Sequence, residues 1–159
     1  MTKTRRTSRR RANVTVTEES KLPDMLRKLE ELAAKEVHVG AAGDAELAMI
    51  AGIHEYGSIK AGIPARSFIG SGRKKASAAV SKLVRTKLQD LAEGSLDAES
   101  FLKQIGDLAQ QSVLKNFDRI RTPPLSPIYA RRKGSRKILV QEQELRDSIT
   151  YLITGRKRR

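Results

Sequence analysis

Histidines and carboxylates are the residues of this chain that could support acid–base or metal chemistry. The 159 residues include two histidines, His38 and His54, and no cysteine. Glu55 follows His54, but the second histidine of a zinc-binding H-E-x-x-H motif is missing. A three-ligand site made by His38, His54 and a carboxylate stays open. We favour a partly buried structural role for His54 on the apolar side of a helix, and we expect no metal and no cofactor.

The nucleophile and phosphate-binding motifs are also incomplete. The sequence has no G-x-S-x-G turn of the kind that presents a catalytic serine. Residues 70–74 read Gly-Ser-Gly-Arg-Lys, which lacks the G-x-x-x-x-G-K-[ST] spacing of a phosphate-binding loop. The 18 acidic residues are scattered singly or in pairs, and none forms an evident general acid–base pair. We therefore expect a protein that is not an enzyme.

The most distinctive stretch is a loop between two predicted helices. Residues 53–57 read Ile-His-Glu-Tyr-Gly, and residues 63–70 read Ile-Pro-Ala-Arg-Ser-Phe-Ile-Gly. Loops are usually polar and variable, so a loop with proline, arginine, phenylalanine and glycine in close order indicates a defined shape. We predict that this loop is the interaction core of an assembly protein.

Positive charge is concentrated at the two ends of the chain. The net charge is +14; residues 1–11 contribute +6 and residues 156–159 contribute +4, which leaves +4 for the residues between them. Such blocks tend to be disordered and to attract polyanions, so they are either solvated tails or contacts for nucleic-acid phosphates or an acidic protein surface. The residues concerned are Arg5, Arg6, Arg9, Arg10, Arg11, Arg156, Lys157, Arg158 and Arg159.

A second basic cluster lies between positions 119 and 137, on predicted loops around two proline breaks. Aromatic residues make up 4% of the chain, which argues against reading of single-stranded bases by stacking. Sequence-blind contact with phosphates or an acidic surface is one interpretation. Solvated loop residues, or ion pairs with Glu142 and Glu144, are the other. The candidate contact residues here are Arg131, Arg132, Lys133 and Arg136.

The periodicity of apolar residues predicts the elements that carry these groups. A weak strand is expected at 12–17, a helix with a leucine stripe from Ser20 to near Lys35, and a strand at 37–39. Further helices are predicted from Asp44 to Gly57, from residue 64 or 66 to about 92, and from residue 95 or 97 to the prolines at 123 and 124. A short helix at 126–131, an apolar run at 138–140, a helical turn at 144–145 and a strand at 148–153 follow.

This order of elements predicts an α+β fold, with a small antiparallel sheet packed against two long helices and with basic extended N- and C-terminal tails. We divide the chain into a basic N-terminal arm (1–12), a single domain (13–155) and a basic C-terminal tail (156–159). No apolar run approaches the roughly 20 residues that span a bilayer. The basic N-terminus is not followed by the apolar segment of a secretory signal.

Two segments resemble phage tail-completion and virion-morphogenesis proteins. In that family a helix with a His/Asn-Glu-x-Gly end precedes an I-P-A-R-P-F turn, which matches residues 53–57 and 63–70. Residues 124–134, Pro-Leu-Ser-Pro-Ile-Tyr-Ala-Arg-Arg-Lys-Gly, together with Leu139-Val140 and the stretch 145–151 that leads into the last predicted strand, resemble the C-terminal part of the family. The resemblance covers roughly positions 35–153. Ser67 replaces a family proline, which implies a less rigid turn, and Glu142 and Gln143 replace a Thr-Gly pair.

The resemblance implies a structural virion protein of a tailed double-stranded DNA phage, located in the neck at the head–tail junction and assembled in the host cytoplasm. Such proteins complete the tail or join it to the head as homo-oligomeric rings around the DNA path, next to the tail terminator, the connector or stopper, and the tail tube. They need no cofactor and no membrane, and non-specific contact with packaged DNA would give the basic tails a use.

The resemblance also implies roles for the loop residues. Pro64 would set the loop, Phe68 would anchor it in apolar surface within the fold or at a subunit contact, and Arg66 would pair with a carboxylate. The predicted protein-interaction residues are His54, Glu55, Tyr56, Ile63, Pro64, Arg66 and Phe68. The alternative function is a small basic nucleic-acid-binding protein that acts through phosphate contacts.

Overall fold

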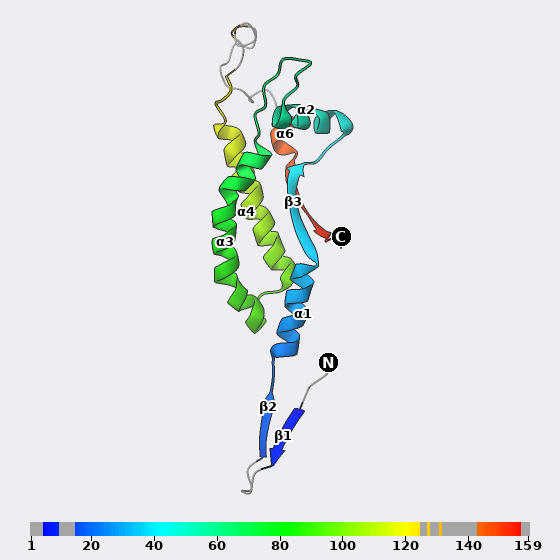
Figure 1. Ribbon diagram of the computed structural model, residues 1–159, viewed down its shortest axis with the longest axis vertical. Helices are drawn as coiled ribbons and strands as arrows, with labels where there is room; N and C mark the ends of the chain where they lie inside the picture. Colours follow the sequence, from blue (N-terminus) through cyan, green and yellow to red (C-terminus); the bar gives the residue numbers. More distant parts are fainter. Residues whose placement is uncertain (1–4, 10–14, 125–126, 128–130, 132–142, 157–159) are drawn as a thin grey trace.

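The computed structural model describes residues 5–9, 15–124, 127, 131 and 143–156, with only the backbone described for 5–9 and 15–19. Within these residues the fold is an elongated α+β arrangement, as predicted (Figure 1). Its elements are β1 (Arg5–Arg9), β2 (Thr15–Glu19), α1 (Leu22–Ala33), β3 (Lys35–Ala41), α2 (Ala45–Tyr56), α3 (Ile69–Glu93), α4 (Ala98–Arg119), α6 (Gln143–Asp147) and β4 (Ile149–Gly155).

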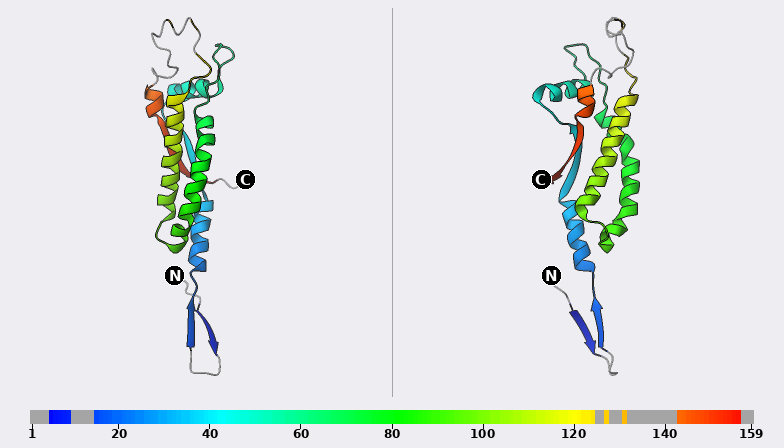
Figure 2. Two further views of the ribbon diagram at one scale, coloured as in Figure 1. Left: turned by 90° about the vertical axis from the view of Figure 1, so that its left-hand side faces the viewer. Right: turned by 180° about the vertical axis from the view of Figure 1, so that it is seen from behind.

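The domain has two layers. Strands β3 and β4 form an antiparallel pair in which Val37 lies opposite Ile153 and Val39 opposite Tyr151, and these β-branched and aromatic residues favour strands. Helix α4 packs against both strands, and α3 packs against α4 (Figure 2). The predicted small antiparallel sheet against two long helices is confirmed.

The main core lies where α3 and α4 meet the α6–β4 segment. Phe68, Val113, Phe117, Leu145 and Ile149 are all buried there, and the rings of Phe68 and Phe117 meet edge to face with centroids 5.2 Å apart. Aromatic pairs prefer this geometry because of their quadrupoles. The predicted burial of Phe68 is confirmed, and it is achieved inside the fold.

Local signals in the sequence set most helix ends. The Asp44 side chain accepts the Leu47 N–H at 2.8 Å at the start of α2, and Asp97 accepts the Ser100 N–H at 2.8 Å at the start of α4. Gly94 adopts a left-handed conformation, with φ at 87°, and ends α3. Helix α3 begins at Ile69, later than predicted, and the Gly72 N–H donates to the carbonyl of its N-cap residue Phe68 at 3.1 Å.

The N-terminal region differs from the predicted disordered arm. Strands β1 and β2 form an antiparallel hairpin whose register places Arg5 opposite Glu19 and Arg6 opposite Glu18. Opposite charges at facing positions and β-branched Thr and Val favour such pairing. The strand expected at 12–17 starts at Thr15 instead. In Figure 1 this hairpin extends from the far end of α1, away from the domain.

Helix α1 has the predicted leucine stripe, but the described residues bury only one end of it. Leu32 packs beside the buried residues Leu91, Ala98 and Phe101. Leu22, Leu26 and Leu29 are 54%, 50% and 36% exposed.

Two predicted elements of the C-terminal region, the apolar run at 138–140 and most of the helix at 126–131, lie outside the described residues. The turn of helix at 144–145 and the last strand are confirmed as α6 and β4. None of the helices that the structure describes is long and apolar enough to cross a membrane.

Candidate functional site

Glu55 connects the end of α2 to the start of α3. Its carboxylate accepts the backbone N–H groups of Ile69 and Gly70, both at 2.9 Å, and the Ser67 hydroxyl at 2.6 Å. These N–H groups begin α3, which has no side-chain cap of its own at Phe68. A carboxylate at this position satisfies orphan donors and meets the positive end of the helix dipole. Glu55 therefore caps a helix to which it does not belong.

Arg66 connects the same turn to the chain beyond α4. Its side chain is buried, with 6% exposure, and its guanidinium donates from Nε to the Pro123 carbonyl at 3.1 Å and from Nη2 to the Pro124 carbonyl at 3.3 Å. The predicted carboxylate partner is wrong. The planar fork of arginine binds two adjacent carbonyls in the same way as it binds a carboxylate, so the residue type alone did not distinguish the two acceptors.

Residues 57–65, called here the 57–65 loop, project from this clamp as a tight reversal. Ser58 and Ile63 exchange two backbone hydrogen bonds of 2.8 and 2.9 Å. Gly57 has φ at 79°, and a Cβ there would lie 2.8 Å from the Ala65 nitrogen, so glycine is required. The base of the loop is thus held by the backbone pairing of Ser58 with Ile63 and by Gly57, which no other residue type can replace without strain.

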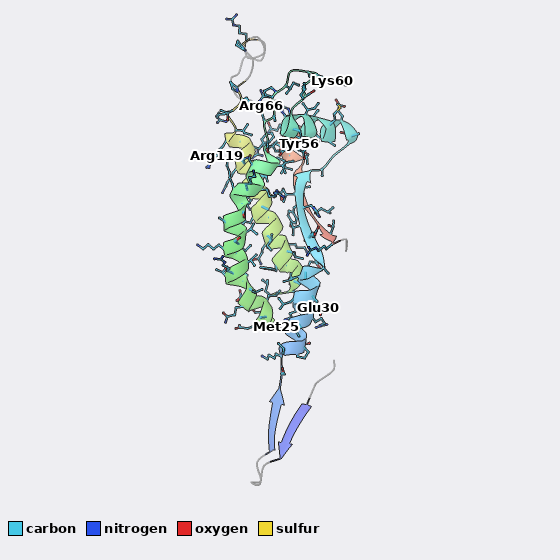
Figure 3. The ribbon with its side chains drawn as sticks, viewed as in Figure 1. Met25, Glu30, Tyr56, Lys60, Arg66 and Arg119 are labelled. Atoms are coloured by element: carbon cyan, nitrogen blue, oxygen red, sulfur yellow. The ribbon has the colours of Figure 1, made fainter. Side chains whose placement is uncertain are left out.

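Three large apolar side chains on α2 and the loop are exposed. Tyr56 is 84% exposed, Ile59 at the tip is 102% exposed, and Met49 on α2 is 59% exposed. Figure 3 shows Tyr56 and Lys60 at the end of the molecule opposite Met25. Large apolar side chains presented on a rigid turn are typical anchors of protein–protein contacts. We call Met49, Tyr56 and Ile59 the apolar tip.

The predicted interaction residues therefore separate into two groups. Tyr56 and Pro64 are exposed, and Ile63 is half-buried beside them. Glu55, Arg66 and Phe68 form the support beneath the loop, and half-buried His54 contributes its backbone carbonyl to that support. Ser67 does not leave its turn loose, because its hydroxyl donates to Glu55 and its Oγ accepts the Ser71 N–H at 3.3 Å.

Asn116 on α4 completes the support from below. It is 3% exposed, and its amide nitrogen donates to the Phe68 carbonyl at 2.8 Å and to the Ser71 hydroxyl at 2.6 Å. Its amide oxygen accepts the Lys75 ammonium. A buried amide is costly unless it is hydrogen-bonded, so these contacts also fix α3 against α4 at the loop end.

An ion pair attaches α6 to the same end of α4. Arg146 donates from Nε and Nη2 to the two oxygens of Asp118, at 2.9 and 3.1 Å. The hydrogen bonds from Arg146 lower the pKa of Asp118 below its usual range, and burial opposes that shift weakly. Both side chains are partly exposed, so the pair orients α6 more than it stabilises the fold.

The predicted basic contacts are only partly described. Arg5, Arg6 and Arg9 occupy β1, and Arg131 is exposed. Arg156 is tied to the sheet, since its N–H donates to the Ala34 carbonyl at 2.7 Å and its Nε lies 3.3 Å from a Glu36 oxygen. The remaining predicted contacts lie outside the described residues: Arg10, Arg11, Arg132, Lys133, Arg136, Lys157, Arg158 and Arg159.

Sequence reasoning missed two members of the apolar tip, Met49 and Ile59. The position of Ile59 between Gly57 and Gly62 was the signal that could have identified it as exposed. A tight turn with glycines at φ of 79° and 62° has little room to bury an apolar side chain of its own. Met49 carried no such signal, because it stands within a helix that is apolar on most sides.

The described part of the chain contains no group of three histidine or acidic side chains able to hold a metal ion. Comparisons of the sequence and the structure with protein-family models, curated proteins and solved structures gave no match.

Proposed function

We propose that this protein is a structural virion component of a tailed double-stranded DNA phage that completes the tail or joins it to the head as a ring-forming neck subunit. In this proposal the 57–65 loop and the apolar tip contact a neighbouring neck or tail protein. The protein has no catalytic role and binds no cofactor. Its place is the head–tail junction of the particle, after assembly in the host cytoplasm.

One observation carries the proposal. The two segments that resemble the tail-completion family are far apart in sequence, yet Arg66 of the first binds the carbonyl of Pro124, the first residue of the second, and that of Pro123 just before it. Phe68 of the first also shares a core with Leu145 and Ile149 of the second. A chance match of two separate sequence motifs would not require the two segments to contact each other. Here the two segments pack together and support one exposed loop, which supports the resemblance.

The chemistry of the loop end agrees with a docking role. The apolar tip is rigidly supported, and the exposed Arg119 and Arg121 lie at the same end of α4. An apolar centre with a charged rim is the usual composition of a protein interface. Partners with an apolar pocket and acidic surroundings, such as a ring protein at a tail end, would fit this surface.

Association with tails tests the proposal. Purified protein is mixed with tail tubes from the phage that encodes it, and binding is measured by co-sedimentation and electron microscopy of tail ends. We expect rings at one end of the tube, and we expect the double variant Tyr56→Ala/Ile59→Ala to lose them. Leu152→Ala, which removes a 63%-exposed leucine from β4, is the control that should bind normally.

Failure of the wild-type protein to bind tail tubes, terminator and connector would reject the function. The neighbourhood of the gene gives an independent check, because genes for portal, capsid and tail-tube proteins are expected beside it.

One observation favours the second candidate, sequence-blind binding of nucleic acid. Helix α3 has no acidic residue before Asp90, and Arg73, Lys74, Lys82 and Arg85 are all exposed on it. Such a row attracts phosphates, and the logarithm of the affinity for duplex DNA would then fall linearly with the logarithm of the salt concentration. Unchanged binding in a Lys82→Gln/Arg85→Gln variant would exclude this helix as the contact.

A further inference from the structure

Strand β3 has a free edge on the side away from β4. The N–H of Ala42 donates to the Ser148 carbonyl at 2.9 Å, and the N–H of Arg156 donates to the Ala34 carbonyl at 2.7 Å. Because hydrogen-bonded positions alternate along an antiparallel ladder, even-numbered residues of β3 face β4. The backbone groups of Val37, Val39 and Ala41 therefore point to the other edge, where no strand of the described residues pairs with them.

A hollow runs along this free edge. It consists of two adjoining parts of about 490 and 480 Å³, both lined by Val37, Val39 and Arg73. The first continues under α2, and the second is bounded by Ala76 and Val80 of α3. Two packed helices cover about 20 Å, whereas two strands cover only about 10 Å, so the sheet is narrower than the helical layer above it. The difference between the two layers, about 10 Å, equals the width of two added strands.

Among the described residues, the β1–β2 hairpin lacks a third strand or a packing surface, and the free edge of β3 lacks a paired strand. Its two strands pair with each other, and neither has an extensive contact with another described element. An isolated two-stranded hairpin is marginally stable in water and needs a third strand or a packing surface. Each strand has five residues, and so does the stretch 37–41 of the free edge.

The hairpin cannot reach the free edge of its own chain. Helix α1 separates the two, and only Ala34 connects α1 to β3. The twelve residues of α1 are about 18 Å long. A five-residue strand that folded back along α1 would cover about 17 Å and would end near Lys35. Figure 1 shows the hairpin at the opposite end of α1 from β3.

We propose that the hairpin of one copy adds to the β3 edge of a neighbouring copy, through β2, and completes an intermolecular sheet beside α3. Charge agrees with this pairing, because β2 ends in Glu18 and Glu19 and the hollow is bordered by Arg73 and Lys74. Docking would also bring the exposed leucines of α1 against the neighbour. The inference rests on the homo-oligomer in the proposed function and not on the identity of the particle.

Cross-linking between copies tests this pairing, and the absence of native cysteine makes it specific. One batch has Thr17→Cys on β2, and a second, affinity-tagged batch has His38→Cys, at the exposed position of β3. The mixture is treated with a short bis-maleimide, in solution and on tail ends. We expect a linked heterodimer. A mixture in which Lys115→Cys, on the exposed side of α4, replaces His38→Cys should give none.

A second variant tests the strand addition itself. Thr17→Pro removes a backbone donor from β2, so we expect loss of self-association in sedimentation with an unchanged melting temperature. No heterodimer in solution or on tails, or self-association that survives Thr17→Pro, overturns the inference. Linking within one chain of a Thr17→Cys/His38→Cys double variant at high dilution also overturns it. If the cross-linked oligomers form but do not bind tail tubes, the proposed function is rejected while the strand pairing stands.

Discussion

The carboxylate of Glu55, on the last turn of α2, accepts the backbone N–H of Gly70, in the first turn of α3, at 2.9 Å. The two residues are fifteen positions apart, and everything between them forms the turn, the loop and its support. A single side chain thus closes the base of the exposed loop and starts the longest helix of the chain. Its loss should affect stability and loop position together.

Glu55→Gln should destabilise the protein by about 1–2 kcal/mol, because the amide keeps one acceptor but loses the charge at the helix N-terminus. Urea unfolding followed by circular dichroism measures this change. Glu30→Gln, an exposed substitution on α1, is the matched control and should leave the unfolding midpoint unchanged. Equal midpoints for the two variants would contradict the capping role.

Arg66→Lys should cost about 1–3 kcal/mol in unfolding free energy although the charge is kept, because one ammonium cannot bind the Pro123 and Pro124 carbonyls in a fork and the buried acceptors lose partners. Chemical denaturation is the measurement. Arg73→Lys, at an exposed position of α3, makes the same chemical change without a loss of stability. A neutral Arg66→Lys would mean that the two hydrogen bonds are dispensable.

Phe68→Ala should lower the unfolding free energy by about 3–5 kcal/mol, because the ring is fully buried against Phe117 and its removal leaves a cavity. Tyr56→Ala, which removes an aromatic ring from the surface, should change stability by no more than about 0.5 kcal/mol. Differential scanning calorimetry separates the two. A soluble, fully stable Phe68→Ala protein would contradict the observed core.

Asp118→Asn should show a small, pH-dependent loss. The pKa of Asp118 is lowered in the folded state, so its contribution is present above the unfolded pKa, near pH 4, and disappears as the pH falls through the folded pKa. Because the pair is partly exposed, the wild-type advantage at pH 7 should stay below about 1 kcal/mol. Thermal melts from pH 7 to pH 2 should show the two curves converging.

The sequence was sufficient for features whose causes are local. Asp44 and Asp97 were identifiable as helix starts and Gly57 and Gly94 as helix ends, because caps act within a few residues of themselves. Alternating β-branched residues gave β3 and β4. The small sheet against two long helices followed from the order of these elements.

The sequence was insufficient to predict a side chain's hydrogen-bond partner when that partner is distant along the chain or is a backbone group. The capping of α3 by Glu55 could not be predicted, because the distance from the carboxylate to the helix start depends on the loop between them. Arg66 was assigned the wrong acceptor, since carbonyl directions are set by the fold. The leucine stripe of α1 indicated an apolar face, but periodicity does not say what covers it, and among the described residues Leu22 and Leu26 stay at least half exposed.

The elongated shape gives each subunit a direction. One end presents the β1–β2 hairpin, and Tyr56, Lys60 and Arg119 lie toward the other end (Figures 1 and 3). Identical copies placed around one rotation axis all point the same way, so the closed ring that we propose would have two chemically unlike rims. The proposed ring could then not be inverted between its neighbours, and the order in which rings stack would follow from the shape of the single subunit.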